Sequence, residues 1–332
     1  MAILLLTSPD DTAADRVEAE LRRRGAHVVR FDDKPFPSAA SITLRCASGT
    51  ALRHSIPGVP LGDIHSAWDR RPRTATPPPH ITDSLLRAHI EREASWFMDD
   101  VWETLDCHWF PARRLVIRRA EHKASQLQAA VALGLEIPPT IITNDPRELL
   151  DFYREHGGDI VSKSFMHPAV PAEEGETSNF WVARTEPVTR RDIAHVQAVR
   201  DCPVIFQAYV PKRVELRVTI VGTQLFPMEI HSQDTNRTRY DWRRYDLAHT
   251  VHRRHELPAE VERKLLAFMA HFGLEYGAAD LIVTPDGRYV FLEVNPNGQY
   301  GWAENMTGMP IGAAIADHLM AFDAARPVAA LA

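Results

Sequence analysis

The sequence predicts a mixed α/β protein, with a small parallel α/β unit at the N-terminus and an α+β organisation in the remainder. Two observations carry this prediction. First, an apolar run at 3–6, a helical pattern at 11–24 that stops at Gly25, and a second apolar run at 27–31 indicate a β-α-β opening. Second, two β-branched runs flank the Pro-Asp-Gly sequence at 285–287, which favours a β-hairpin.

The composition is that of an ordinary globular protein, because 45% of the 332 residues are hydrophobic and 25% are charged. The 38 basic and 44 acidic side chains give a net charge of −6, which provides no general basic field for nucleic acid. The three cysteines are scattered, so neither a disulfide framework nor a zinc spacing is predicted. The first apolar run lacks a cationic start and is too short for a signal peptide or a membrane span, so we expect a cytoplasmic protein.

Apolar periodicity and breaks at Gly or Pro predict the elements that follow the β-α-β unit in the first half of the chain. They are antiparallel strands within 41–55, a proline-rich loop at 69–80, a long helix at 81–105, a helix at about 121–133, a strand after the proline break at 137–142, a helix at 145–154 and a short strand at 160–165. The first loop of the chain lacks the G-x-G-x-x-G pattern, so we predict no dinucleotide site of that kind.

The second half is predicted to be richer in strands. Its expected elements are a mobile polar loop at 166–179, a strand at 180–184, a helix at 192–199, strands at 204–210, 216–221 and 224–230, a long charge-dense loop at 231–256, a helix at 257–273, the hairpin and a last helix at about 310–322.

The hairpin carries the most informative residues. If its turn is two- or four-membered about Asp286 and Gly287, the register places Asp280 opposite Glu293, with Asn295 on the same face as Glu293. Like charges that face each other destabilise a sheet unless something positive lies between them. Two carboxylates and an amide oxygen are hard ligands that suit Mg²⁺ with substrate phosphates. The alternative interpretation is an acidic, solvated edge hairpin.

Three charged residues on other strands could serve the same site. Lys163 lies at a strand end beside the polar loop and could reach phosphates as a point charge, although an isolated lysine is usually a solvated surface charge. Glu215 and Arg217 share one face of a strand and are most simply an ion pair. Beside a phosphate site, however, the acid could hold a hydroxyl group, and the guanidinium could neutralise a transferring phosphoryl group.

A cluster of arginines occupies the loop before the hairpin. Such a cluster is most often a solvated face, but it could also hold an acidic substrate. Its members are Arg237, Arg239, Arg243 and Arg244.

The order of these features resembles that of an ATP-grasp ligase, and residues of about 115–320 are further similar to the microviridin-type maturases, which make graspetides. The resemblance rests on several short sequences in the same order. They are Gly-Leu-Glu-Ile-Pro-Pro-Thr (134–140), Tyr-Val-Pro-Lys-Arg-Val-Glu-Leu-Arg-Val (209–218), Glu-Ile-His-Ser-Gln (229–233), Asp-Trp-Arg-Arg-Tyr-Asp (241–246) and Leu-Glu-Val-Asn-Pro-Asn-Gly-Gln (292–299).

The resemblance implies an ATP-grasp fold with an N-terminal pre-ATP-grasp domain (1–114), a central subdomain (115–203) and a C-terminal subdomain with the metal hairpin (204–332). It also implies ATP and Mg²⁺ as cofactors. The nucleotide would be held by Lys123 and Lys163 on its phosphates, by the hinge Gln207, Ala208, Tyr209 and Val210, with the backbone of Ala208 and Tyr209 on the adenine, and by Glu215 on the ribose. Asp280, Glu293 and Asn295 would bind Mg²⁺, and Arg217, Arg243 and Lys163 would be catalytic.

The sequence differs from the pattern of this family in two places. The phosphate loop has only Gly175 as a glycine, and the first hundred residues match only in broad outline.

The leading hypothesis is therefore an ATP-dependent peptide macrocyclase. It would activate Asp or Glu side chains of a ribosomal precursor peptide, with a leader and an acidic core, and join them to Thr or Ser hydroxyls or to Lys amines. We expect the leader to bind near 166–184 and the enzyme to pair as a homodimer, with neither nucleic acid nor membrane as a partner. The alternatives are an ATP-grasp ligase acting on free amino acids, small peptides or a protein terminus, and a nucleotide-binding scaffold without catalysis.

Overall fold

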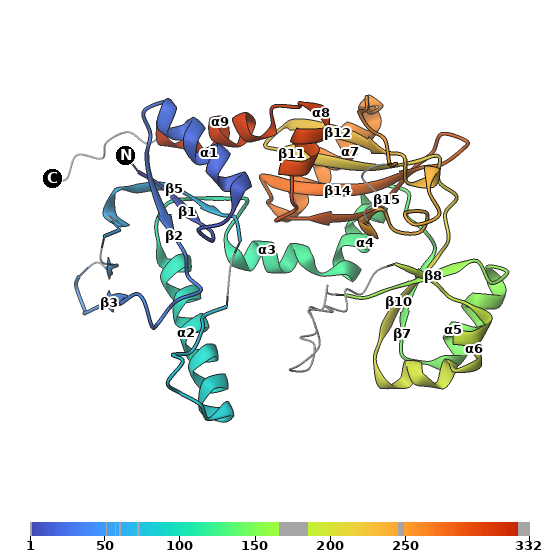
Figure 1. Ribbon diagram of the computed structural model, residues 1–332, viewed down its shortest axis with the longest axis horizontal. Helices are drawn as coiled ribbons and strands as arrows, with labels where there is room; N and C mark the ends of the chain where they lie inside the picture. Colours follow the sequence, from blue (N-terminus) through green and yellow to red (C-terminus); the bar gives the residue numbers. More distant parts are fainter. Residues whose placement is uncertain are drawn as a thin grey trace.

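The computed structural model describes residues 2–50, 52–56, 58–59, 61–71, 74–165, 185–244 and 249–324. The expected phosphate loop, the strand at 180–184 and the leader site near them lie outside these residues. Figure 1 shows the N-terminal sheet at one end of the molecule and two further sheets at the other. None of the described helices is long and apolar enough to cross a membrane.

The N-terminal sheet confirms the predicted β-α-β opening. Its strands have the order β2-β1-β5-β6 and are all parallel. They are β1 (Ala2–Leu6), β2 (His27–Phe31), β5 (Ile64–Asp69) and β6 (His108–Phe110), and α1 (Thr12–Arg23) connects the first two. Asp11 caps α1 by accepting the backbone N–H groups of Ala13 and Ala14. Strands β5 and β6 were not predicted, because β5 mixes His and Ser with apolar residues and β6 is only three residues long.

Three elements surround this sheet. The predicted antiparallel strands are β3 (Thr43–Arg45) and β4 (Arg53–Ser55), and a short 3-10 helix, η1 (Leu61–Asp63), precedes β5. The long helix α2 (Ser84–Thr104) begins after Asp83, whose side chain accepts the N–H of Leu86, so it starts three residues later than predicted. Figure 1 shows α2 extending away from the sheet.

The second sheet is antiparallel with the order β7-β10-β8-β9. Its elements are β7 (Thr140–Thr143), α5 (Pro146–Glu155), β8 (Ile160–Lys163), β9 (Glu186–Pro187), α6 (Arg190–Ala194), the 3-10 helix η2 (Val196–Asp201) and β10 (Val204–Ala208). The helix predicted at 192–199 was wrong as a single helix, because the chain changes from α6 to η2 at His195.

The third sheet has five antiparallel strands in the order β13-β12-β11-β14-β15, and α7 packs on one face. Its elements are β11 (Val214–Val221), β12 (Gln224–Ile230), β13 (His252–Arg254), α7 (Ala259–Phe272), β14 (Tyr276–Val283) and β15 (Tyr289–Asn295). The prediction of a loop throughout 231–256 was wrong, because η3 (Ser232–Asp234), η4 (Trp242–Arg244) and β13 lie within it.

The hairpin β14–β15 has the predicted register at the candidate site and a different one at the turn. Asp280 pairs with Glu293 as expected, but Leu281 pairs with Phe291, so Leu292 is an extra residue in β15. The strand pairing closes at Val283 and Tyr289, which leaves an odd loop of five residues between them. The assumption of a two- or four-membered turn was therefore wrong, and the bulge at Leu292 restores the pairing of the two carboxylates.

Four helices connect the sheets. They are α3 (Arg114–Glu121), α4 (Lys123–Ala132), α8 (Gly301–Thr307) and α9 (Ile311–Ala324). The helix predicted at 121–133 corresponds to α4, while α3 and α8 were missed. The chain turns between α3 and α4 at His122, which leaves the helical conformation with ψ 108°.

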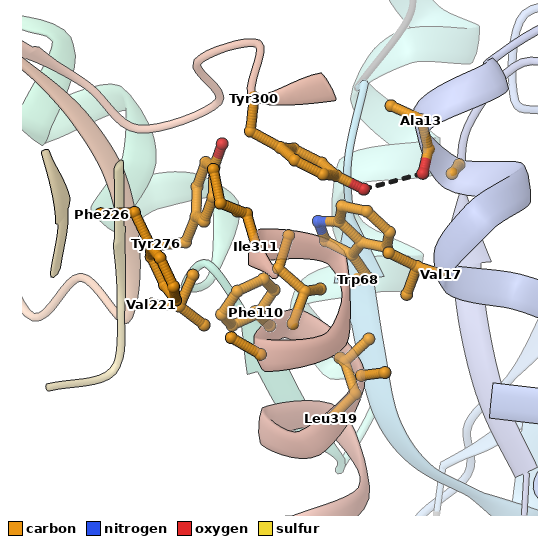
Figure 2. Packing of buried hydrophobic residues seen from close by; sticks show 14 of the residues in the cluster. Ala13, Val17, Trp68, Phe110, Val221, Phe226, Tyr276, Tyr300, Ile311 and Leu319 are labelled. Carbon is orange, nitrogen blue, oxygen red and sulfur yellow. Dashed lines mark hydrogen bonds between the residues drawn. The ribbon is translucent and has the colours of Figure 1, made fainter. Parts of the chain in front are cut away.

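The last helix returns to the N-terminal sheet, where α9 packs against α1 and β5. One core cluster joins Trp68 and Phe110 of the N-terminal sheet to Tyr276 and Ile311 from the far end of the chain (Figure 2). Within it the hydroxyl group of Tyr300 donates to the carbonyl of Ala13 over 2.7 Å. The two ends of the described chain therefore share one core.

A half-buried ion cluster lies at the same junction. His108 of β6 and His318 of α9 both donate from Nε2 to Oε2 of Glu275, over 2.7 and 2.6 Å. Burial alone would raise the pKa of Glu275, but the two imidazole hydrogen bonds outweigh it and hold the pKa at about 2. This pKa lies below the value of about 4.3 expected in the unfolded chain.

The depressed pKa of Glu275 predicts how stability depends on pH. The contribution of Glu275 should be complete above about pH 4.3 and should disappear as the pH falls towards 2. Because its side chain keeps 34% of its surface exposed, we discount the contribution to about 1 kcal/mol, or roughly 2 °C in Tm. Thermal unfolding of the wild type and of Glu275→Gln should therefore differ at pH 7 and converge as the pH approaches about 2. A difference that stays constant with pH would contradict this prediction.

Candidate active site

A cavity with a volume of about 730 Å³ lies between the second and third sheets. Strands β8 and β10 form one side, β14 and β15 form the other, and α4 and η4 complete it. Nearly all residues that the sequence predicted for the site line this cavity. They are Lys123, Lys163, Gln207, Ala208, Tyr209, Val210, Glu215, Arg243, Asp280, Glu293 and Asn295.

The two opposed carboxylates of the hairpin have different surroundings. Glu293 accepts a hydrogen bond from Lys123 Nζ over 2.6 Å. Burial would raise the pKa of Glu293, but the charges of Lys123 and Lys163 outweigh burial and hold the pKa at about 2. Burial raises the pKa of Asp280 to about 6, and Arg217 offsets this only in part. The positive charge that the sequence argument required near the pair is therefore present, mainly at Glu293.

Arg217 is the one predicted residue that lies behind the cavity lining. Its Nε lies 3.2 Å from Oδ1 of Asp280, and its guanidinium lies 5.1 Å from the ring centroid of Trp242. Within the described part of the chain, Arg217 Nε and Nη1 and Asp280 Oδ1 are buried without a hydrogen bond. Nε and Oδ1 face each other as an ion pair, but buried charged atoms that lack hydrogen bonds are still costly unless a ligand satisfies them.

The buried atoms without hydrogen bonds show whether the site suits a divalent metal ion. Oδ1 of Asp280 is a buried acceptor without a hydrogen bond among the described residues, and the carboxylate of Glu293 lies opposite it. The amide of Asn295 lines the same cavity, so all the donors are oxygen atoms. Oxygen donors of this kind suit Mg²⁺, and the residues therefore fit this ion.

Lys163 ends strand β8 and faces the carboxylates. Burial, together with the nearby charges of Lys212 and Arg243, lowers its pKa to about 8, although Glu293 and Glu215 act in the opposite direction. No hydrogen bond or ion pair engages its ammonium group in the part of the chain that the structure describes. A desolvated ammonium group in this position is suited to an anionic ligand.

Arg243 is fixed in place by a residue whose role the sequence did not predict. Asp241 accepts from Nε and Nη2 of Arg243, both over 2.8 Å, and from the backbone N–H of Thr185 over 3.0 Å. Burial would raise the pKa of Asp241, but these bonds outweigh burial and hold the pKa at about 2. The Asp-x-Arg spacing was the only available signal. Of the four clustered arginines only Arg243 lines the cavity, while Arg237 and Arg239 are exposed.

Glu215 is buried beside a lysine that the sequence argument also missed. Its Oε1 accepts from Ser232 Oγ over 2.6 Å and lies 3.1 Å from Lys212 Nζ. Lys212 also donates to the carbonyl of Tyr240 over 3.0 Å, so it holds the loop above the cavity. Lys212 follows the hinge directly, and its neighbours gave no periodic signal.

The hinge has fewer free backbone groups than expected. The N–H of Ala208 donates to Pro139 and that of Tyr209 donates to Asp159, over 2.9 and 2.8 Å. Opposed residues in an antiparallel ladder normally exchange two bonds, but Pro139 has no N–H to return to the carbonyl of Ala208. This carbonyl and the N–H of Val210 make no hydrogen bond with any residue that the structure describes. Among the described residues, the hinge backbone groups available to contact the adenine are therefore the carbonyl of Ala208 and the N–H of Val210.

A cavity of this size between two antiparallel sheets, with lysines, arginines and opposed carboxylates around it, defines the class of ATP-grasp ligases. The model of the MvdD pre-ATP grasp domain matches residues 2–115. Among solved structures, the macrocyclase MdnC bound with precursor peptide MdnA, from Microcystis aeruginosa MRC, is 33% identical with a TM-score of 0.84. The match covers 97% of this chain and 100% of that chain.

Two further structures are similar over nearly the whole chain. Macrocyclase MdnB from Microcystis aeruginosa MRC is 31% identical, with a TM-score of 0.78 and coverage of 96% and 98%. The RiPP-associated ATP-grasp ligase of Chryseobacterium gregarium, in complex with ADP and a leader and core peptide, is 27% identical, with a TM-score of 0.86 and coverage of 96% of each chain. The comparison with curated proteins found no match. The chain belongs to the microviridin-type family of ATP-grasp ligases, and the predicted fold class is confirmed.

Proposed function

We propose that the protein is an ATP-dependent ligase that activates Asp or Glu side chains of a ribosomal precursor peptide. It joins them to Thr or Ser hydroxyls or to Lys amines and so forms macrocyclic esters or amides. The observation that carries the proposal is the cavity in which Asp280 and Glu293 lie opposite Lys163 and Arg243, with Arg217 behind the lining beside Asp280. The precursor peptide bound to the similar MdnC supports a peptide as the substrate.

The reaction needs two steps. A substrate carboxylate attacks the γ-phosphorus of ATP, which forms an acyl phosphate and releases ADP. A hydroxyl or amine of the same peptide then attacks the acyl carbon, loses its proton, and displaces inorganic phosphate. Each ring therefore costs the peptide the mass of one water molecule. The enzyme contributes positioning and charge neutralisation, which lysines and arginines supply.

The predicted cationic residues near the cavity would bind different groups during the two steps. Lys163 and Lys123 would bind the phosphates, and Lys123 would exchange part of its contact with Glu293 for them. Arg217 would neutralise the transferring phosphoryl group, and Arg243, held by Asp241, would stabilise the oxyanion of the acyl phosphate. Asp280, Glu293 and Asn295 would hold Mg²⁺, which supplies further positive charge at the phosphates when bound.

The nucleotide would enter from the hinge. The carbonyl of Ala208 would accept from the 6-amino group of adenine, the N–H of Val210 would donate to the ring, and Glu215 would bind the ribose. We also propose that the domains are 1–114, 115–203 and 204–332 and that the protein is cytoplasmic. We further propose that it forms a homodimer, which light scattering on the purified protein would test.

The hinge predicts selectivity for the base. ITP carries a carbonyl oxygen at the position where ATP carries its 6-amino group. This oxygen would face the carbonyl oxygen of Ala208, and two acceptors cannot form a hydrogen bond. We expect kcat/KM for ITP to be at least about 100-fold lower than for ATP, because a site built around a hydrogen bond rejects analogues that cannot make it. Release of the two nucleoside diphosphates by the same enzyme preparation measures this ratio. Similar values for ATP and ITP would exclude a hydrogen bond to the 6-amino group.

The proposed function itself is tested with a Thr- and Glu-rich peptide encoded by a neighbouring gene. Incubation with the enzyme, ATP and Mg²⁺ should produce losses of one water per ring by mass spectrometry, and no loss without ATP. Hydrolysis of the product in mild base distinguishes esters from amides. An unchanged peptide mass together with ATP turnover on free amino acids would favour the alternative ligase class instead.

A further inference from the structure

Arg70 is a fully buried charge that the proposed mechanism does not use. It follows β5 in the N-terminal sheet, and only 1% of its surface is exposed. The carboxylate nearest to it is Asp11, whose Oδ2 lies 3.6 Å from Arg70 Nε, beyond hydrogen-bond distance. Asp11 is already engaged by Thr7 and by the N-terminus of α1. A buried guanidinium needs better partners than this loose ion pair.

Its better partners come from the other end of the chain. Arg70 Nη2 donates to Oε1 of Gln299 over 2.6 Å, and Nη1 donates to the carbonyl of Asn297 over 3.2 Å. The guanidinium also lies 5.8 and 5.6 Å from the ring centroids of Trp68 and Tyr300, which are adjacent in the shared core (Figure 2). Arg70 therefore connects the N-terminal sheet to the segment that directly follows the metal hairpin.

That segment is a tight turn that touches the metal ligand. The N–H of Asn297 donates to Oδ1 of Asn295 over 3.1 Å, and the N–H of Gly298 donates to the carbonyl of Asn295 over 3.2 Å. The turn has little room to move, because a Cβ at Gly298 would lie 2.3 Å from the Cβ of Ala278. The hydroxyl group of Tyr276 also donates to the carbonyl of Gly298.

We propose that Arg70 is a positioning residue for the Mg²⁺ site. It holds the carbonyl of Asn297 and so fixes the turn in which the N–H of Asn297, part of the preceding peptide group, orients the amide oxygen of Asn295 towards the metal. The pre-ATP-grasp domain thereby controls the affinity of a metal site that it does not itself line. This inference rests on the metal role of Asn295 in the proposed function. Residues that orient a metal ligand typically change metal affinity by about 10–100-fold when they are removed.

The test is direct metal binding without a peptide substrate. Mn²⁺ serves as the probe in the presence of ADP, and its dissociation constant is measured by electron paramagnetic resonance. We expect Arg70→Met to weaken Mn²⁺ binding by about 10–100-fold. Arg70→Lys, which keeps the charge but cannot reach both acceptors, should lose less Mn²⁺ affinity than Arg70→Met. Gln299→Leu, which removes one acceptor, should also lose less Mn²⁺ affinity than Arg70→Met. In turnover assays, high Mg²⁺ should restore the kcat of each variant.

Arg16→Met is the matched control. Arg16 is an exposed residue of α1 that also bonds across the junction, to Oδ1 of Asn305 over 2.6 Å, but it does not touch the turn. Its Mn²⁺ affinity should equal that of the wild type. Unchanged Mn²⁺ affinity in folded Arg70 variants would overturn the proposal, even if Tm falls. If Arg70→Met does not fold, Arg70→Lys and Gln299→Leu decide the same point.

The outcomes separate this inference from the proposed function. Wild-type protein that binds Mn²⁺ with ADP, but leaves every peptide unchanged, would remove the macrocyclase assignment and leave the role of Arg70 intact. Wild-type protein that binds no Mn²⁺ with ADP would overturn both.

Discussion

Glu293→Gln is expected to abolish peptide modification. The carboxylate of Glu293 faces Asp280 across the hairpin and is held in the ionised state by Lys123 and Lys163. A neutral amide at this position would remove the charge that binds Mg²⁺ and would leave the two lysines without their counter-charge. Loss of one group that stabilises charge in a transition state costs about 10²–10³-fold in rate, and we expect at least this much. The measurement is the rate of ADP release and of water loss from the precursor peptide.

The control for Glu293 lies on the same hairpin. Asp286→Asn removes an exposed carboxylate at the turn, where it bonds to Arg288 and does not line the cavity. Its rate should match that of the wild type. A Glu293→Gln variant that folds and keeps a tenth of the wild-type rate would contradict the assignment of Glu293 to the metal.

Arg217→Lys is expected to lower kcat far more than it raises KM for ATP. The guanidinium lies behind the cavity lining with two nitrogens that lack hydrogen bonds among the described residues, so it is prepared for an oxyanion. Lysine keeps the charge beside Asp280, but its compact ammonium group lacks the planar fork with which a guanidinium binds two phosphoryl oxygens in a fixed geometry. Because the charge on the transferring group develops in the transition state, we expect a loss of about 10²–10³-fold in kcat.

Arg288→Lys provides the matched comparison for Arg217. Arg288 is an exposed arginine in the loop between β14 and β15 that bonds to Asp286, and its replacement should leave both kcat and KM unchanged. If Arg217→Lys instead raised KM at constant kcat, the arginine would bind ATP equally in the ground state and the transition state. That result would contradict its catalytic assignment.

The pairing of Asp280 with Glu293 was predictable because strand geometry is periodic. A turn signal and alternating side chains were enough to place both carboxylates on one face. The turn itself was assigned the wrong length, and the site kept its register only because Leu292 forms a bulge. A bulge depends on how the strands of the whole sheet pair with one another, so no local sequence pattern predicted the bulge at Leu292.

Partners of the predicted residues were harder to foresee. The sequence pointed to Arg243 and Glu215 by resemblance, but Asp241 and Lys212, which hold them, carried no periodic signal. Likewise, strand β6 is only three residues long and is stabilised by neighbours rather than by its own pattern. Short strands of this kind depend on contacts that the local sequence does not record.

The sequence by itself determined the β-α-β opening, the hairpin with its opposed carboxylates and the set of charged residues that face the cavity. Each of these follows from local periodicity, turn chemistry or a recognisable short sequence. Only the tertiary structure decided which backbone groups of the hinge remain free, because their partners Pro139 and Asp159 lie just before the separate strands β7 and β8. It alone also brought Arg70 of the N-terminal sheet to the turn beside Asn295. The contact of Arg70 with Asn297 joins residues 227 positions apart. The energies of all these contacts depend on packing that a linear pattern does not contain.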